Sequence, residues 1–190
     1  MSERMSETVI GKLQLDRSLV GRIQKGDEAS VLALYDACFS PMMNVVVRYK
    51  NNREAQISLI NNAFLKAVKN IAQFQLGTSF VSWMKVILHN EIIDDFRKNK
   101  RHYATIQLHE QKEVGEEADF DENYDFSVEK IKVTAVLSKL PPATRTVFNL
   151  FLWDDFSPSE IASELEISID TVRWHIKMAR KLIRHQIEKS

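Results

Sequence analysis

The sequence predicts an all-α protein of two small helical domains joined by an acidic, flexible linker. Only 5 glycines and 4 prolines occur in 190 residues, and apolar residues recur at helical rather than alternating spacing. Apolar residues make up 44% and charged residues 27%, which is ordinary for a soluble chain that buries a core. Lys and Arg outnumber Asp and Glu by 15 to 10 in residues 1–102 (+5) and by 10 to 8 in 127–190 (+2). Residues 103–126 instead carry 1 basic and 8 acidic side chains (−7), so we expect domains at 1–102 and 127–190 with the linker between them.

Composition also excludes several classes of protein. The single cysteine, Cys38, has no partner for an internal disulfide and is expected to be a buried, small apolar residue in a reducing compartment. The five histidines show no metal-ligand spacing, so we expect no metal and no cofactor. The longest apolar stretches fall far short of the roughly 18 residues that a membrane span needs, and the N-terminus has no apolar signal segment. These features predict a cytoplasmic protein with no membrane insertion.

The first elements of the N-terminal domain are short helices. A helix with Leu19 and Ile23 on one face is expected to end at Gly26, which tolerates a left-handed conformation. Asp27 is placed to cap the next helix, and Pro41 is expected to interrupt or restart it.

Two longer helices follow in the same domain. From Gln56 to Ile71 the apolar side chains recur at i, i+3 and i+4, which predicts one buried helical face. A loop containing Gly77 separates this helix from a second amphipathic helix that begins near Phe80. The second helix is expected to end in the basic cluster of residues 97–101, just before the acidic linker.

The C-terminal domain carries two strong helix-start signals. Its opening apolar segment is broken at Pro141-Pro142. The tetrad Ser157-Pro158-Ser159-Glu160 predicts a capping box, and Ser168 predicts the start of a second helix after a short break.

This pair of helices has helix-turn-helix spacing. The second helix turns five mostly basic side chains away from its apolar face: Arg173, Trp174, Lys177, Lys181 and Arg184. Such a helix suits the DNA major groove, which is read by side chains near the helix N-terminus. A helical hairpin with a solvated basic face has the same spacing, so spacing alone leaves both interpretations open.

The order of several motifs resembles a known family. The N-terminal part contains GDEASVLALYD, AFLKAVKNIAQF, then Phe80 and WMKVILHNEIIDDFR, and the C-terminal part contains LSKLPPATRTVFNLFLWDDFSPSEIASELEISIDTVRWHIKMARKLI. These resemble regions 2 and 4 of the sigma-70 family of bacterial RNA polymerase sigma factors, in its compact extracytoplasmic-function (ECF) group. The resemblance covers almost the whole chain, and the order of the fragments makes it specific.

The resemblance implies a promoter-specificity subunit that performs no covalent chemistry. Its partners would be the clamp helices and flap of core RNA polymerase, promoter DNA, and an anti-sigma factor. Region 2 would dock on the clamp through the helix 55–70, with Ser58, Asn61, Asn62 and Lys66 as the matching positions. The family usually places acidic residues and glutamine there, so this contact would be less salt-sensitive than usual.

The resemblance also implies which residues contact DNA. In region 2, the loop 74–81 would hold a flipped base of the −10 element, and the matching residues are Gln75, Thr78, Ser79, Asn90, Asp94, Arg97 and Arg101. In region 4, the −35 element would be read by Ser168, Thr171, Arg173, Trp174, Lys177, Lys181 and Arg184. Trp174 occupies a position that is often small or polar in the family, and Met178 occupies one that is often arginine. These two differences put readout of the upstream element in question.

Other interpretations remain open at this point. Phe80 and Trp83 fit a hydrophobic core better than base stacking, and residues 97–101 also fit a solvated helix end. The neutral Ser58, Asn61 and Asn62 motivate an alternative, a sigma-derived helix-turn-helix regulator that does not engage polymerase. A further alternative is a sigma factor that another bound factor recruits to DNA. An enzyme is not expected, because no nucleophile, base or phosphate-binding constellation is placed to act together.

Overall fold

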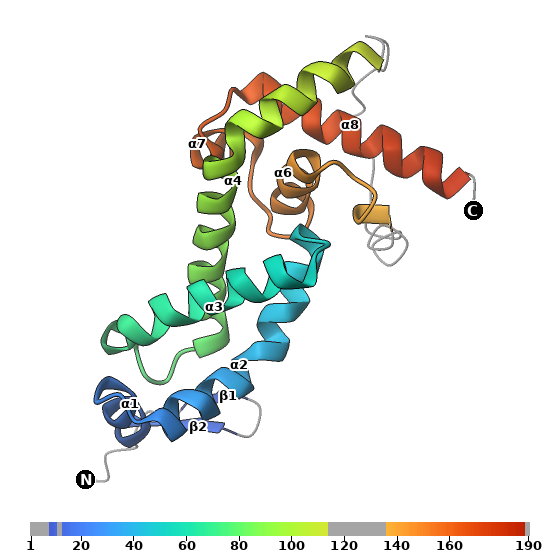
Figure 1. The fold of residues 1–190 in the computed structure, drawn as a ribbon. Coiled ribbons are helices and arrows are strands. Elements are labelled where there is room, and N and C mark those ends of the chain that lie inside the picture. The colour runs from blue at the N-terminus through green and yellow to red at the C-terminus, as the bar shows by residue number, and fades with distance from the viewer. Residues whose placement is uncertain (1–7, 11–12, 114–135, 189–190) are drawn as a thin grey trace. The chain divides into compact units, whose positions relative to one another are not determined.

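The computed structural model describes residues 8–10, 13–113 and 136–188, which form two compact units (Figure 1). The first unit comprises the described residues up to Val47 together with Asn52–Ile92, and the second comprises Arg48–Asn51 and the described residues from Ile93 on. Apart from one small hairpin, the regular elements of the described residues are helices, which confirms the predicted all-α class.

The elements follow one another along the chain as a hairpin and then helices (Figure 1). They are β1 (Thr8–Ile10), β2 (Leu13–Leu15), α1 (Arg17–Gln24), α2 (Glu28–Tyr49), α3 (Arg53–Lys69), the 3-10 helix η1 (Ile71–Gln73), α4 (Phe80–Glu113), α6 (Pro142–Leu152), α7 (Pro158–Leu165) and α8 (Ile169–Glu188).

The hairpin pairs β1 with β2 antiparallel, with Ile10 opposite Leu13. Ile10 and Leu15 are buried, so the hairpin contributes to the core of the first unit. Sequence reasoning missed it because three-residue strands are too short to display an alternating pattern.

The predicted boundary between α1 and α2 is confirmed. Gly26 adopts a left-handed φ of 78° after α1. The Asp27 side chain accepts a hydrogen bond from the Ser30 backbone N–H at 2.9 Å, which caps α2. Asp16 caps α1 in the same way through the Leu19 N–H at 2.7 Å.

The expected break at Pro41 is wrong, because α2 runs through it without interruption. A proline in a helix interior loses one backbone hydrogen bond. Cys38 and Met42, on either side of Pro41, are buried, and this packing holds the helix continuous. Burial also raises the pKa of the Cys38 thiol to about 12, as expected for a structural cysteine.

By length and composition alone, α2 could also span a membrane. Its apolar side chains Leu34, Val45 and Val46 are nevertheless buried within the protein, as in the core helix of a soluble domain. The absence of a membrane anchor stays a prediction.

The first unit's core is formed where α2, α3 and α4 contribute their buried faces. The predicted face of α3 is confirmed by the burial of Ile60, Ala63 and Ala67. Phe80 is fully buried at the start of α4, and its ring lies 5.1 Å from that of Phe74 in an edge-to-face arrangement. Phe80 is thus a core residue, as the alternative interpretation held.

Helix α4 extends farther than the sequence predicted. It continues past the basic cluster to Glu113 as one helix, so residues 103–113 of the predicted linker are helical (Figure 1). The rest of that linker, 114–126, lies outside the described residues.

The second unit is built around α8, against which α6 and α7 pack. Its hydrophobic cluster includes Leu137, Leu140, Phe148, Ala179 and Ile183. Within this unit, the buried Asn149 side chain donates to the Arg48 carbonyl oxygen at 2.7 Å.

The helix-turn-helix begins with the predicted capping box. The Ser157 hydroxyl accepts from the Glu160 N–H at 3.3 Å, and the Glu160 carboxylate accepts from the Ser157 N–H at 2.8 Å. Asp155 before it adopts a left-handed φ of 57°, a conformation that Asp tolerates better than most residues.

We expect Ser157→Ala to lower the free energy of unfolding of the second unit by about 1 kcal/mol, because it removes the cap from α7. Urea unfolding can be followed in a Trp83→Phe background, in which Trp153 and Trp174 report on the second unit alone. Ser163→Ala, in the middle of α7, is the matched control and should not destabilise the protein. Equal midpoints for the two variants would contradict the role of the cap.

Candidate nucleic-acid interface

The exposed side of α8 carries a continuous basic stripe. Arg173, Lys177, Lys181 and Arg184 recur at intervals of four, four and three residues, which places them on one helical face. Arg173, Lys181 and Arg184 are exposed, and Lys177 is half-buried. Their positive charges can contact DNA phosphates and base edges without leaving the helix surface.

The opposite side of α8 packs into the core. Met178 is buried, so it does not belong to the basic stripe, and a methionine at this position leaves the charge of the stripe unchanged. Trp174 is half-buried beside the stripe, and its ring lies edge-on to the ring of His175 at 4.9 Å. Of the two residues that put readout of the upstream element in question, only Trp174 therefore remains.

The start of α8 is held by hydroxyl groups. Ser168 accepts a hydrogen bond from the Thr171 N–H at 3.1 Å, and the two hydroxyls lie 2.9 Å apart, which confirms the predicted helix start. Arg173 lies 3.7 Å from Asp170, and both side chains are largely exposed. Water screens this ion pair, so Arg173 can exchange Asp170 for a base edge at little cost.

A buried histidine lies on the side of α8 that packs against α6. His175 is 3% exposed, and its Nδ1 lies 2.9 Å from the Thr144 hydroxyl of α6. Burial lowers the pKa of His175 from 6.5 to about 4, because the charged imidazolium loses its hydration. The packing of α6 against α8 therefore requires neutral His175.

This burial predicts that the second unit loses stability in acid. The unfolded chain takes up a proton near pH 6.5, whereas folded His175 stays neutral until about pH 4. The free energy of unfolding should therefore fall as pH drops through this interval, by at most about 3 kcal/mol. His175→Gln should remove this part of the pH dependence, measured by urea unfolding in the Trp83→Phe background. His185→Gln, at an exposed position of the same helix, should keep the parental slope; a parental slope in His175→Gln would contradict the prediction.

The candidate base-binding loop is short and is stabilised by hydrogen bonds among its own residues and to the start of α4. Gly77 has a φ of 87°, a conformation that favours glycine. The Thr78 hydroxyl donates to the Gln75 carbonyl oxygen at 2.7 Å, and the Ser79 hydroxyl accepts from the Ser82 N–H at 3.2 Å. Ser79 thus caps α4, and Gln75, Thr78 and Ser79 are all exposed.

The other predicted −10 residues share one face of α4. Asn90, Asp94, Arg97 and Arg101 recur at intervals of four, three and four residues. Asn90 is 11 residues beyond Ser79, which corresponds to about 16 Å along a helix. Ser79 and Asn90 would therefore meet different nucleotides of a −10 element.

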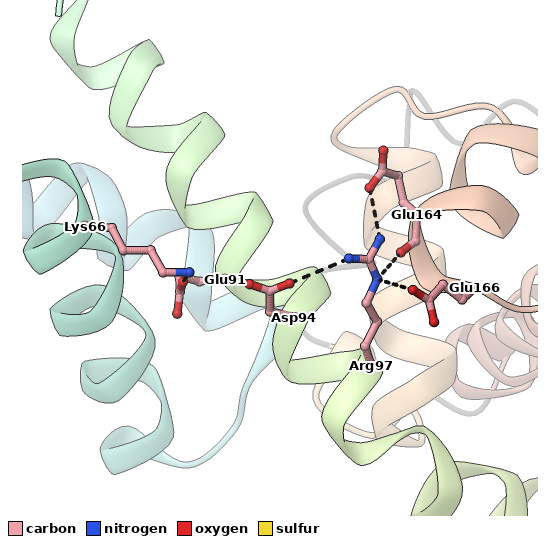
Figure 2. Close-up of polar contacts among 6 residues, drawn as sticks. All are labelled: Lys66, Glu91, Asp94, Arg97, Glu164 and Glu166. Carbon is pink, nitrogen blue, oxygen red and sulfur yellow. Dashed lines mark hydrogen bonds and ion pairs between the residues drawn. The ribbon is translucent and has the colours of Figure 1, made fainter. Parts of the chain in front are cut away.

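Arg97 is engaged by acidic side chains within the second unit, as Figure 2 shows. Its guanidinium lies 3.7 Å from Asp94, 3.6 Å from Glu164 and 3.7 Å from Glu166, and its Nε donates to the Glu164 carbonyl oxygen at 2.7 Å. Lys100 donates to the Glu166 carbonyl oxygen. A phosphate that binds Arg97 would have to replace these contacts, which sequence reasoning missed because they join residues 67 and 69 positions apart.

The predicted polymerase-binding residues lie together on the exposed side of α3. Ser58, Asn61 and Asn62 are exposed, and they line an open hollow of about 380 Å³ together with Glu54 and Ile57. The Asn61 side-chain oxygen accepts a hydrogen bond from the Tyr35 hydroxyl at 2.8 Å.

Lys66, the fourth predicted residue on α3, forms an ion pair with Glu91 of α4 (Figure 2). The Glu91 side chain is only 7% exposed, so this pair stabilises the packing of α3 against α4. Among the residues that the structure describes, no group of three or more His, Cys, Asp and Glu side chains could hold a metal ion.

Comparison with protein families identifies both halves of the chain. Residues 34–102 match the family described as "Sigma-70 region 2", and residues 130–183 match "Sigma-70, region 4". The chain belongs to the sigma-70 family. It is a sigma factor of the ECF type, and sigma factors of this family are not enzymes.

Known sigma factors align with most of this one. It is 26% identical over 176 residues to the ECF RNA polymerase sigma factor SigW of Bacillus subtilis, covering 88% of this chain and 94% of SigW. It is 24% identical over 181 residues to the ECF RNA polymerase sigma-E factor of Haemophilus influenzae, covering 91% and 95%. A solved structure of the sigma factor RpoE with the anti-sigma factor NepR from Bartonella quintana aligns with a TM-score of 0.44 at 19% identity, over 86% of this chain and 98% of that one.

The family matches assign the surfaces of this sigma factor to its two regions. The region 2 match includes α3, the loop after η1 and α4 as far as His102. The region 4 match includes α6, α7 and most of α8, with Arg173, Lys177 and Lys181 of its basic stripe.

Sequence reasoning did not select Leu65, an exposed leucine on the same helix as the α3 residues. The available signal was its position three and four residues after Asn62 and Asn61, which places it on their side of the helix.

Proposed function

We propose that this ECF sigma factor binds two parts of core RNA polymerase. The exposed side of α3 binds the clamp helices, and region 4 binds the flap. The sigma factor then recognises the −10 element through the loop after η1 and through α4, and the −35 element through α8. The matches to region 2 and region 4 in one chain carry this proposal, because the two promoter elements are contacted by different regions. The basic stripe of α8 supports it further, since one helix fits the major groove.

Region 2 would promote DNA melting by capturing a base. Unstacking a base costs a few kcal/mol, which hydrogen bonds to the base edge inside a shaped site can offset. Gln75 and Thr78 are exposed polar residues on this loop, and Asn90 and Arg101 lie farther along α4. There they would contact the neighbouring strand.

The site of action would be the bacterial cytoplasm, where core polymerase meets the chromosome. An anti-sigma factor is the regulator that the family favours, and it would compete for the surfaces that bind polymerase.

Transcription with purified core polymerase tests the whole proposal. Adding this protein to core polymerase and genomic DNA should produce transcripts that start at a restricted set of promoters, and sequencing their 5′ ends gives the recognised elements. Transcripts identical to those of core polymerase alone would contradict the proposal.

A second candidate function is a helix-turn-helix regulator that acts without polymerase. Ser58, Asn61 and Asn62 offer no carboxylate to a basic partner, which is the observation that favours it. Co-purification separates the two: a sigma factor is recovered with core polymerase, whereas such a regulator binds its DNA site but not the enzyme. A sigma factor recruited by another bound factor would bind polymerase and yet start transcription only in that factor's presence.

A further inference from the structure

The exposed side of α4 carries one apolar residue among polar ones. Ser82, Val86 and Asn90 follow one another at intervals of four residues, and all three are exposed. Val86 is 60% exposed, and no other residue of α4 belongs to the exposed large apolar side chains in the described part of the chain. Single apolar residues are common on surfaces, so the position of Val86 decides whether it has a role.

Val86 lies between two parts of the proposed −10 contact. Ser79 caps α4 at the end of the base-binding loop, seven residues before Val86, and Asn90 is four residues after it. Seven residues are nearly two helical turns and four are just over one turn, so all three side chains lie on one side of the helix. Val86 and Asn90 are about 6 Å apart along the helix axis, so they can meet neighbouring nucleotides.

The turn that bears Val86 is held by aromatic packing. Trp83, three residues before Val86, is half-buried, and its ring lies 5.6 Å from that of Phe74 and 5.4 Å from that of Phe80. A valine in a helix also adopts essentially one side-chain rotamer. Val86 therefore presents its two methyl groups in a fixed place, and little conformational entropy is lost when they are covered.

The charged residues around Val86 are compatible with DNA. No Asp or Glu occurs in residues 79–90, and the first carboxylate of α4, Glu91, is buried and paired with Lys66 (Figure 2). Lys85 is exposed, and as the preceding residue it lies about 100° around the helix from Val86. A phosphate can therefore approach Lys85 without burying its charge against Val86.

We propose that Val86 is a specificity-determining residue of −10 recognition and contacts the 5-methyl group of a thymine. This inference rests on the proposed function and adds an apolar contact to the polar region 2 residues. Thymine is the DNA base that carries an apolar group on its edge, and apolar side chains distinguish it by contact with that methyl group. A polar base edge packed against Val86 would instead lose its hydrogen bonds to water.

Deoxyuridine substitution in the −10 element tests the inference, because uracil differs from thymine only by the missing methyl group. Each thymine of a promoter identified by transcript sequencing is replaced in turn, and the affinity of the complex of this protein with core polymerase is measured on a template with a pre-opened bubble. In the parent, one replacement should weaken binding by about fourfold, the value for one methyl group removed from an apolar contact. Val86→Ala should bind the thymine template about fourfold less tightly than the parent does, and should bind the thymine and uracil templates equally.

Two further variants serve as controls. Val86→Ile retains an apolar contact and should keep the discrimination between thymine and uracil. Val47→Ala is the matched control, because Val47 is a 45% exposed valine on α2, and it should keep the parental affinity and discrimination. The unfolding midpoint should change little in all three variants, since each replaced side chain is exposed.

Equal binding of thymine and uracil templates by the parent at every position would overturn the inference, and so would parental discrimination in Val86→Ala. A loss of affinity for core polymerase in the absence of DNA in Val86→Ala would also overturn it, because Val86 would then be covered by protein. If the parent with core polymerase starts no transcripts of its own, the proposed function fails first, so the two failures are distinguishable.

Discussion

Replacing Gln75 and Thr78 by alanine is expected to reduce promoter melting on duplex DNA by at least about tenfold. Each lost hydrogen bond to a captured base removes roughly 1 kcal/mol or more, and about 1.4 kcal/mol corresponds to tenfold. The variant keeps Gly77, which has a positive φ, and Ser79, which caps α4. Folding and polymerase binding should therefore remain nearly unchanged.

The measurement is permanganate reactivity of unpaired thymines in a promoter identified by transcript sequencing. A template with a pre-opened bubble should restore much of the transcription, because the base no longer has to be unstacked. Gln73→Ala is the matched control, since Gln73 is an exposed amide in η1, just before the loop. If the double variant melts duplex promoters as well as the parent does, base capture takes place elsewhere on region 2.

Alanine substitutions at the two ends of the basic stripe are expected to have different effects. Arg173 is near the start of α8, where a recognition helix meets base edges, and Arg184 is 11 residues farther, about 16 Å along the helix. Arg173→Ala should cost about 1 to 3 kcal/mol on the specific site and relax the preference at one base position. Arg184→Ala should weaken binding to all sequences alike and reduce the salt slope by roughly one unit.

Binding of the polymerase complex to specific and random duplexes over a salt series distinguishes these roles. Arg53→Ala, at an exposed arginine at the start of α3, controls for the general loss of a positive charge. If Arg173→Ala and Arg184→Ala lose equal affinity on specific and random duplexes, α8 contacts only the DNA backbone and the proposed base contact of Arg173 is wrong.

Local features of the fold were predictable because their causes lie within a few residues. The capping box at Ser157, the cap at Ser168 and the left-handed Gly26 each depend on atoms within one helical turn. The length of α4 could also have been predicted, since no glycine or proline occurs between Phe80 and Glu113. The acidic composition obscured that signal, because charged residues are found both in linkers and on solvated helices.

The break predicted at Pro41 shows where local reasoning is insufficient. A proline favours interruption in an isolated helix, but tertiary packing overrides local propensity when neighbouring turns are buried. Met178 shows the same limit on the candidate site. Periodicity places it near both faces of α8, and only its burial assigns it to the core.

The sequence by itself determined the helical class, the helix starts, the basic stripe of α8 and the family, since helical periodicity and motif order are properties of the chain. Only the tertiary structure showed that Arg97 is engaged by Glu164 and Glu166, and that Leu65 is left uncovered beside Asn61 and Asn62. Contacts between residues far apart in the chain depend on how whole helices pack. A periodic pattern reports which side of a helix is apolar, but not what finally covers each side chain.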